Sequence, residues 1–148
     1  MSTYIDTRDL EDRRQELEVD FEQLHRAIMD AEGALEEFGD GERRVEYEEA
    51  LEQAKDNLTE WEVNGYRDEF GSLNNLRDKF DLRSWRYGVT LIPESEFRNY
   101  AMDLAENIHG GVEGWPFDCI DWEQAADSLR MDYSRVEYNG ETYLYRES

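Results

Sequence analysis

Residues 135–146 read RVEYNGETYLYR and decide the fold class of the carboxy-terminal half of the chain. Apolar and polar side chains alternate on both sides of Asn139-Gly140, as they do in half-buried strands. An Asn-Gly pair supplies the two positive φ angles of a type I′ turn and is the strongest short-range signal for a β-hairpin. We therefore expect strands over 135–138 and 141–146, joined by this turn.

Upstream of this hairpin the sequence predicts a further strand and two helices. Alternating apolar side chains predict a strand ending at Ile92-Pro93, with inward residues Trp85, Tyr87, Val89 and Leu91. Pro93 suits the first position of a helix that continues to about His109. Asp121 can cap a helix over 121–131. Residues 85–148 are thus expected to form a small α+β module with roughly three antiparallel strands.

Further upstream, apolar residues recur in steps of three, four and seven, the pattern of two helices packed along a seam. The first set is Leu10, Leu17, Phe21, Leu24, Ile28, Ala31, Leu35 and Phe38, and the second is Tyr47, Leu51, Ala54, Leu58 and Trp61. Thr7 can cap the first helix, Arg14 interrupts its seam, and Gly39-Asp40-Gly41 separates the helices. An antiparallel, coiled-coil-like helical hairpin over 1–65 and a connecting helix or linker over 66–84 are expected, in an α+β protein.

Negative charge dominates the composition. The 148 residues hold 38 Asp and Glu against 16 Lys and Arg, a formal net charge of −22. A net charge of about 2–8 already keeps a small domain soluble, so solubility alone explains little of the excess. An acidic surface repels nucleic acids and anionic membranes but attracts the basic proteins that bind nucleic acids. We expect such a basic protein as the partner, with no direct contact to nucleic acid or membrane.

The predicted helical hairpin carries most of this charge, with 21 acids and 7 bases in residues 1–65. Most acids, Glu11 among them, fall off the apolar seam, and the bases are too few to pair with them. The candidate partner-binding residues are Glu42, Glu46, Glu49, Glu52, Asp56 and Glu60 around the second helix, and Glu18, Glu22, Glu32 and Glu36 on the first. Carboxylates along such a rod can meet the Arg and Lys side chains that otherwise bind phosphates.

The spacing of the remaining polar residues indicates neither an enzyme nor a cofactor. Asp118, Asp121 and Glu123 cluster around Cys119, but they lack the alternating oxygens, central Gly and distal Glu of a calcium loop. No metal site is therefore expected. Cys119 itself has no nearby base and is expected to be a small buried residue.

The histidines and the carboxy-terminal aromatic residues are expected to be structural. His25 and His109 have no Cys or His neighbour at ligand spacing. The aromatic residues from Trp115 to Tyr145 lie in an acidic region, whereas base-stacking platforms lie in positive grooves, so we expect them in the core. A single cysteine, no signal-peptide pattern and no apolar run of about 20 residues predict a cytoplasmic protein.

The segment over 91–146 also resembles a known family. Its matching stretches are FRNYA (97–101), LAE (104–106), WPFDCIDWEQAA (115–126), MDYS (131–134) and VEYNGETYLYR (136–146). They resemble the carboxy-terminal segment of ArdA-type antirestriction proteins and of related phage and plasmid proteins. The resemblance implies an acidic protein that mimics the charge and curvature of B-DNA, usually as a dimer, and blocks type I restriction-modification enzymes. The helical hairpin at 1–65 replaces the usual upstream domains of that family.

The sequence therefore favours a phage or mobile-element anti-defence protein acting in the cytoplasm of a bacterial host. It would inhibit a DNA-binding complex, either a restriction-modification enzyme or a CRISPR effector, by mimicking nucleic-acid charge. The target and the formation of a homodimer stay open. The alternative is a helical protein-protein interaction or assembly module whose acidity only keeps it soluble. Exposure of the Leu10–Phe38 seam in a monomer would favour that alternative.

Overall fold

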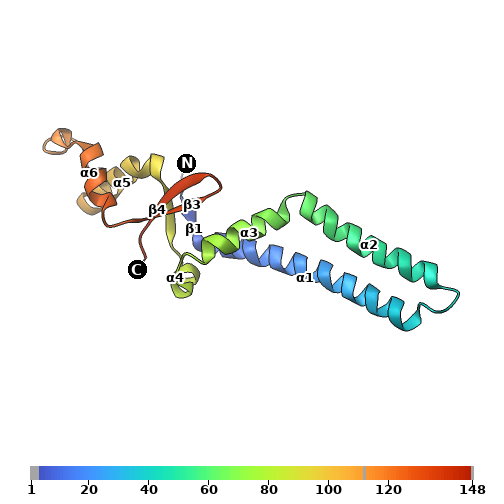
Figure 1. The fold of residues 1–148 in the computed structure, drawn as a ribbon. Coiled ribbons are helices and arrows are strands. Elements are labelled where there is room, and N and C mark those ends of the chain that lie inside the picture. Colours follow the sequence, from blue (N-terminus) through green and yellow to red (C-terminus); the bar gives the residue numbers. More distant parts are fainter. Residues whose placement is uncertain (1–3, 112, 148) are drawn as a thin grey trace. The chain divides into compact units, whose positions relative to one another are not determined.

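The chain folds as two compact units of an α+β protein. The computed structural model describes residues 4–111 and 113–147. Asp12–Asn74 form one unit, which we call the helical unit, and Met1–Glu11 together with Asn75–Ser148 form the other, the sheet unit. Helix α1 (Thr7–Phe38) and helix α3 (Tyr66–Arg77) therefore each contribute residues to both units (Figure 1). Residues 66–84, expected as a connecting helix or linker, hold α3 and the first part of α4 (Leu82–Tyr87).

Helices α1 and α2 (Arg44–Val63) form the predicted hairpin. Leu17 and Trp61 of the seam are buried, and the Phe21 ring lies 5.8 Å from Trp61. Ala54 of the seam is also buried, and Leu24, Ile28, Leu51 and Leu58 are half-buried. Phe38, expected in the seam at the end of α1, is 55% exposed. Side chains between only two helices stay partly exposed, because each helix covers only one stripe of the other.

Helix α3 adds polar contacts to the start of this hairpin. The Arg13 guanidinium donates to both carboxylate oxygens of Glu69, at 3.0 and 2.9 Å, and lies 5.7 Å from the centre of the Tyr66 ring. Arg14, which interrupts the apolar seam, is buried and pairs with Glu18 at 3.2 Å. The residue that breaks the heptad pattern is thus a buried arginine whose charge is paired within the helix.

The sheet unit contains a four-stranded antiparallel sheet in the order β1-β2-β4-β3, formed by β1 (Ile5–Asp6), β2 (Thr90–Pro93), β3 (Ser134–Tyr138) and β4 (Glu141–Tyr145). The predicted hairpin turn is confirmed, with φ angles of 52° at Asn139 and 77° at Gly140. Strand β1 was not predicted from the sequence. Its two residues pair with Thr90 and Leu91 of β2.

Two core clusters stabilise this unit. One contains Leu76, Phe80, Trp85, Val89, Leu91, Val136 and Tyr143. The other contains Ile92, Phe97, Ala101, Ala126 and Leu144, and its helical members come from α5 (Phe97–His109) and α6 (Trp122–Arg130). Neighbouring residues Leu91 and Ile92 belong to different clusters, because successive side chains of a strand point to opposite faces of a sheet.

The strand predicted over 85–92 is only partly present. Residues 82–87 form α4, and the strand begins at Thr90. Trp85 is fully buried, and its Nε1 donates to Glu11 Oε2 at 2.7 Å, so a tertiary contact overrides the local alternation. Glu11 is buried by the same contact and does not lie on the acidic surface as expected.

Two helix starts also differ from expectation. Pro93 ends β2 opposite Tyr143, and a short 3₁₀ helix, η1 (Glu94–Glu96), precedes α5. Thr7 does not cap α1, because its buried hydroxyl accepts from the Val89 amide at 2.8 Å and donates to the Trp85 carbonyl at 2.9 Å. Asp121, in contrast, caps α6 as predicted by accepting from the Glu123 and Gln124 amides.

Tyr87, expected to point inward, is 76% exposed at the end of α4. Two residues of a later segment that were expected in the core also lie on the surface. Cys119, in the 3₁₀ helix η2 (Phe117–Cys119), is exposed, and Trp115 is 83% exposed. Their segment follows the left-handed Gly110 that ends α5, and none of its described residues belongs to either core cluster. Among the described helices, none combines the length and apolar character needed to cross a membrane.

Candidate partner-binding surface

Five of the predicted carboxylates form one stripe on α2. Glu46, Glu49, Glu52, Asp56 and Glu60 follow one another in steps of three or four residues and are all exposed. With 3.6 residues per turn, these steps keep the five within about a third of the helix circumference, on the side opposite the seam. The stripe is about 21 Å long, because the helix rises about 1.5 Å per residue. Glu42, also exposed, lies in the turn that precedes this helix.

The stripe has few internal ion pairs. Glu46 Oε2 accepts from Arg43 Nε at 2.8 Å, between two exposed side chains. Within the described chain, no base lies at ion-pair distance from Glu49, Glu52, Asp56 or Glu60. Exposed carboxylates without an internal cation keep their full capacity to pair with cations of another molecule. We call these five residues the α2 stripe.

The predicted residues of α1 fall into two groups. Glu18 is partly exposed and pairs with Arg14 of the same helix at 3.2 Å, so its charge is partly compensated within α1. Glu22, Glu32 and Glu36 are exposed and have no ion pair among the described residues. Their spacing places them beside the apolar seam rather than opposite it. The α2 residues therefore share one helix face, whereas the three exposed α1 residues lie beside the seam of their own helix.

The charge balance of the helical unit leaves most of its acids unpaired. Residues 12–74, all of which the structure describes, contain 20 acids and 7 bases. Five of those bases, Arg13, Arg14, Arg43, Arg44 and Arg67, pair with six of the acids. Hydrogen bonds to Glu69 and then Glu16 raise the pKa of Arg13 above its usual range. Arg26 and Lys55 are the bases left to balance the remaining 14 acids, so the unit presents a strongly negative field.

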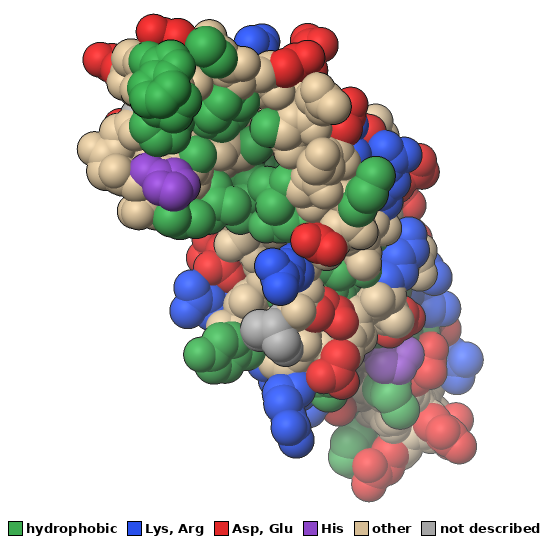
Figure 2. All heavy atoms as spheres, turned by 90° about the vertical axis from the view of Figure 1, so that its left-hand side faces the viewer, with side chains coloured by type: hydrophobic (Ala, Val, Ile, Leu, Met, Phe, Trp, Pro, Cys, Tyr) green, Lys and Arg blue, Asp and Glu red, His purple; other side chains and the backbone are tan. Residues whose placement is uncertain are grey.

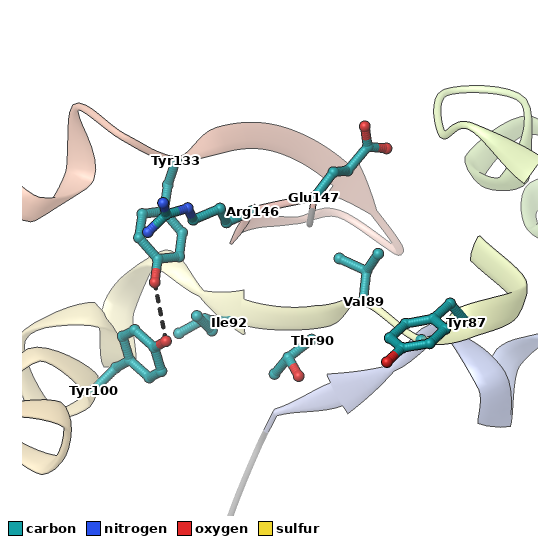
Figure 3. Close-up of a pocket in the computed structure, with 9 residues that line it drawn as sticks. Tyr87, Val89, Thr90, Ile92, Tyr100, Tyr133, Arg146 and Glu147 are labelled. Atoms are coloured by element: carbon teal, nitrogen blue, oxygen red, sulfur yellow. Dashed lines mark hydrogen bonds between the residues drawn. The ribbon is translucent and has the colours of Figure 1, made fainter. Parts of the chain in front are cut away.

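The sheet unit has an open recess of about 610 Å³ beside β2 (Figure 3). Its polar groups include the hydroxyls of Tyr100 and Tyr133, which are 3.0 Å apart and hydrogen-bonded to each other. Burial, and secondly the bond to Tyr100, raises the pKa of Tyr133. The Tyr133 phenol is therefore neutral at physiological pH, and its bond to Tyr100 ties α5 to the residues before β3. Among the described residues that line this recess, no acid is paired with a base.

No group of three or more His, Cys, Asp or Glu side chains suited to a metal ion occurs in the described part of the chain. Comparisons with protein-family models, with curated proteins and with solved structures found no match to this chain. The exposed carboxylates of the hairpin are thus the structural observation that bears on function.

Proposed function

We propose that this chain is an acidic anti-defence protein of a phage or mobile element that inhibits a DNA-binding bacterial defence complex. The α2 stripe occupies the basic channel of a restriction-modification enzyme or CRISPR effector and takes the place of nucleic-acid phosphates. The observation that carries this proposal is the exposure of five carboxylates on one helix face, four of them without an ion pair in the described chain.

The spacing of these carboxylates supports the proposal. One DNA strand presents a phosphate about every 3.4 Å of helix axis, which gives about six over the 21 Å of the stripe. Five carboxylates over the same length approach that linear charge density. A rigid helix also holds them in place before binding, so that little ordering entropy is lost on contact with a row of Arg and Lys side chains.

The packing of the seam bears on the alternative, a helical assembly module whose acidity only solubilises it. Leu17, Ala54 and Trp61 are buried inside the hairpin, and the other central seam residues are half-buried. The surface that faces outward on α2 is therefore acidic, with Val45 and Val63 as its exposed apolar residues. This arrangement favours charge recognition over apolar docking by α2.

The test measures binding of the full chain to a purified type I restriction complex and to a purified CRISPR effector. We expect affinity to fall steeply with salt and double-stranded DNA to compete. A variant that carries Glu46→Gln, Glu49→Gln, Glu52→Gln, Asp56→Asn and Glu60→Gln should weaken binding by about fivefold to a few thousandfold, since five exposed ion pairs of about 0.2–1 kcal/mol each sum to about 1–5 kcal/mol.

A matched variant controls for net charge. It neutralises the same number of exposed acids in the sheet unit, namely Asp78, Asp81, Asp132, Glu137 and Glu147. Its binding should stay within about twofold of the parent, because surface changes away from the stripe remove no contact. Equal losses in both variants would contradict a role specific to α2. Binding whose affinity changes neither with salt nor with added DNA would exclude charge mimicry and favour the assembly alternative.

A further inference from the structure

The sheet unit carries an apolar surface that its core does not use. Ile108 in the last turn of α5 is 68% exposed, Trp115 is 83% exposed, and Ile120 is 37% exposed. Phe117 of η2 lies between them in sequence and is half-buried, with its ring 5.9 Å from that of His109. We call these four residues, Ile108, Trp115, Phe117 and Ile120, the end patch. Figure 2 shows hydrophobic side chains gathered over the part of the unit that carries α5 and α6.

Carboxylates without nearby bases surround this patch in the sequence. Residues 99–129 contain seven Asp and Glu and no Lys or Arg. Glu113, Asp118 and Asp121 are exposed, lie next to the apolar residues in the sequence and have no ion pair among the described residues. Arg130, the first base that follows, is held by Asp127 at 2.8 Å. The sequence around the patch is therefore acidic, and in Figure 2 acidic side chains, with a basic one among them, lie along the upper edge of the hydrophobic area.

The exposed apolar residues and the acidic sequence around them indicate which kind of partner surface would fit. An exposed Trp offers about 150–250 Å² of apolar surface, and Trp is enriched among the residues that dominate binding energy at interfaces. A second copy of the chain would bring two such acidic segments together, and like charges across an interface oppose association. A surface with an apolar centre and a rim of Lys and Arg would match both features.

We propose that the end patch docks on a basic partner with Trp115 as its apolar anchor. The partner surface is a hydrophobic depression bordered by Lys or Arg. This inference rests on the proposed function, because the partner belongs to the same basic class, and it adds a contact whose strength does not depend on charge alone. Apolar burial is insensitive to the moderate salt that weakens carboxylate contacts.

The first test uses defined probes, a fluorescently labelled amphipathic peptide of leucine and lysine and an all-lysine peptide. Binding is measured by anisotropy for the full chain and for Trp115→Ala and Ile108→Gln. Each variant should lose about tenfold in affinity for the leucine-lysine peptide. Both should bind the all-lysine peptide as the parent does. Tyr87→Ala is the matched control, since Tyr87 is 76% exposed in the same unit but outside the patch.

The salt dependence and the oligomeric state separate the remaining outcomes. Trp115→Ala should lower affinity without changing the slope of log affinity against log salt, whereas neutralising the α2 stripe should reduce that slope. Unchanged peptide binding by both patch variants would overturn the inference even if the stripe proves functional. Trp115-dependent dimers that strengthen with salt in light scattering would also overturn it, because a second copy would then cover the patch. If neutralising the α2 stripe left binding to the defence complexes unchanged while the patch variants lost affinity for the leucine-lysine peptide, only the proposed function would be contradicted.

Discussion

Asp6 performs two roles at the first turn of α1. Its Oδ1 accepts from the Arg8 amide at 2.8 Å, and its carboxylate pairs with the Arg8 guanidinium at 2.6 Å. The side-chain bond to Arg8 is the main cause that lowers the pKa of Asp6 below its ordinary value of 3.8, with the backbone amide adding to it. The carboxylate thus satisfies an amide that the helix leaves without an internal acceptor.

We therefore expect Asp6→Ala to lower the free energy of unfolding by about 1 kcal/mol at neutral pH, the usual value for loss of such a cap. A lowered pKa means that this contribution is present above about pH 4 and is lost as the pH falls through the folded-state pKa. The difference between parent and variant, measured by urea denaturation, should shrink below pH 4. Asp6→Asn keeps an acceptor and should lose less. An equal difference at pH 7 and pH 3 would contradict the assignment.

The β3–β4 hairpin shows how one turn determines an element. Val136 faces Tyr143 and Arg135 faces Leu144, so the register places Val136 and Tyr143 in the same core cluster. A slip of one residue would move both side chains to the opposite face. The positive φ angles at Asn139 and Gly140 hold this register.

Gly140→Val should destabilise the protein by about 1–3 kcal/mol, measured by thermal or urea denaturation. The reason is backbone strain and not crowding, because φ is 77° and no atom lies within 4 Å of an added Cβ. Gly140→Asn, which tolerates the left-handed region better, should lose less. Gly41→Val is a second control, since an added Cβ there also meets nothing within 4 Å and its φ is not in that region. If all variants were equally stable, the conclusion that this turn determines the strand register would be wrong.

At the scale of the whole molecule, a net charge of −22 acts against compactness. The ion pairs involve too few bases to compensate it, and the helical unit alone has 13 more acids than bases, from 20 and 7. Self-repulsion at such density destabilises folded chains, and salt relieves it. The same repulsion is tolerated where a basic partner offsets it on binding.

We therefore expect the melting temperature of the chain to rise between about 10 mM and 150 mM sodium chloride, as the Debye length falls from about 30 to 8 Å. Circular dichroism checks this. The variant with five neutral residues on α2 should melt slightly higher at low salt and respond less to salt. A melting temperature that falls with added salt would show that attractive ion pairs outweigh the repulsion.

Local signals account for the parts of the fold that the sequence predicts correctly. The heptad steps predict α1 and α2, Asn139-Gly140 predicts the final turn, and Asp121 predicts the start of α6. Each depends on residues within one or two helical turns or within one tight turn. The α2 stripe was predictable for the same reason, because helical periodicity alone places its carboxylates opposite the seam.

By itself, then, the sequence determined the helical hairpin, the closing β-hairpin and the acidic face of α2, since helix periodicity and turn geometry are properties of short segments. The tertiary structure decided that Thr7 bonds to Val89, 82 residues away. It also decided that Trp85 lies in a helix and that its indole donates a hydrogen bond to the buried Glu11. It also decided that Trp115 is exposed. Burial depends on which distant segments meet, and no local pattern of apolar and polar residues contains that information.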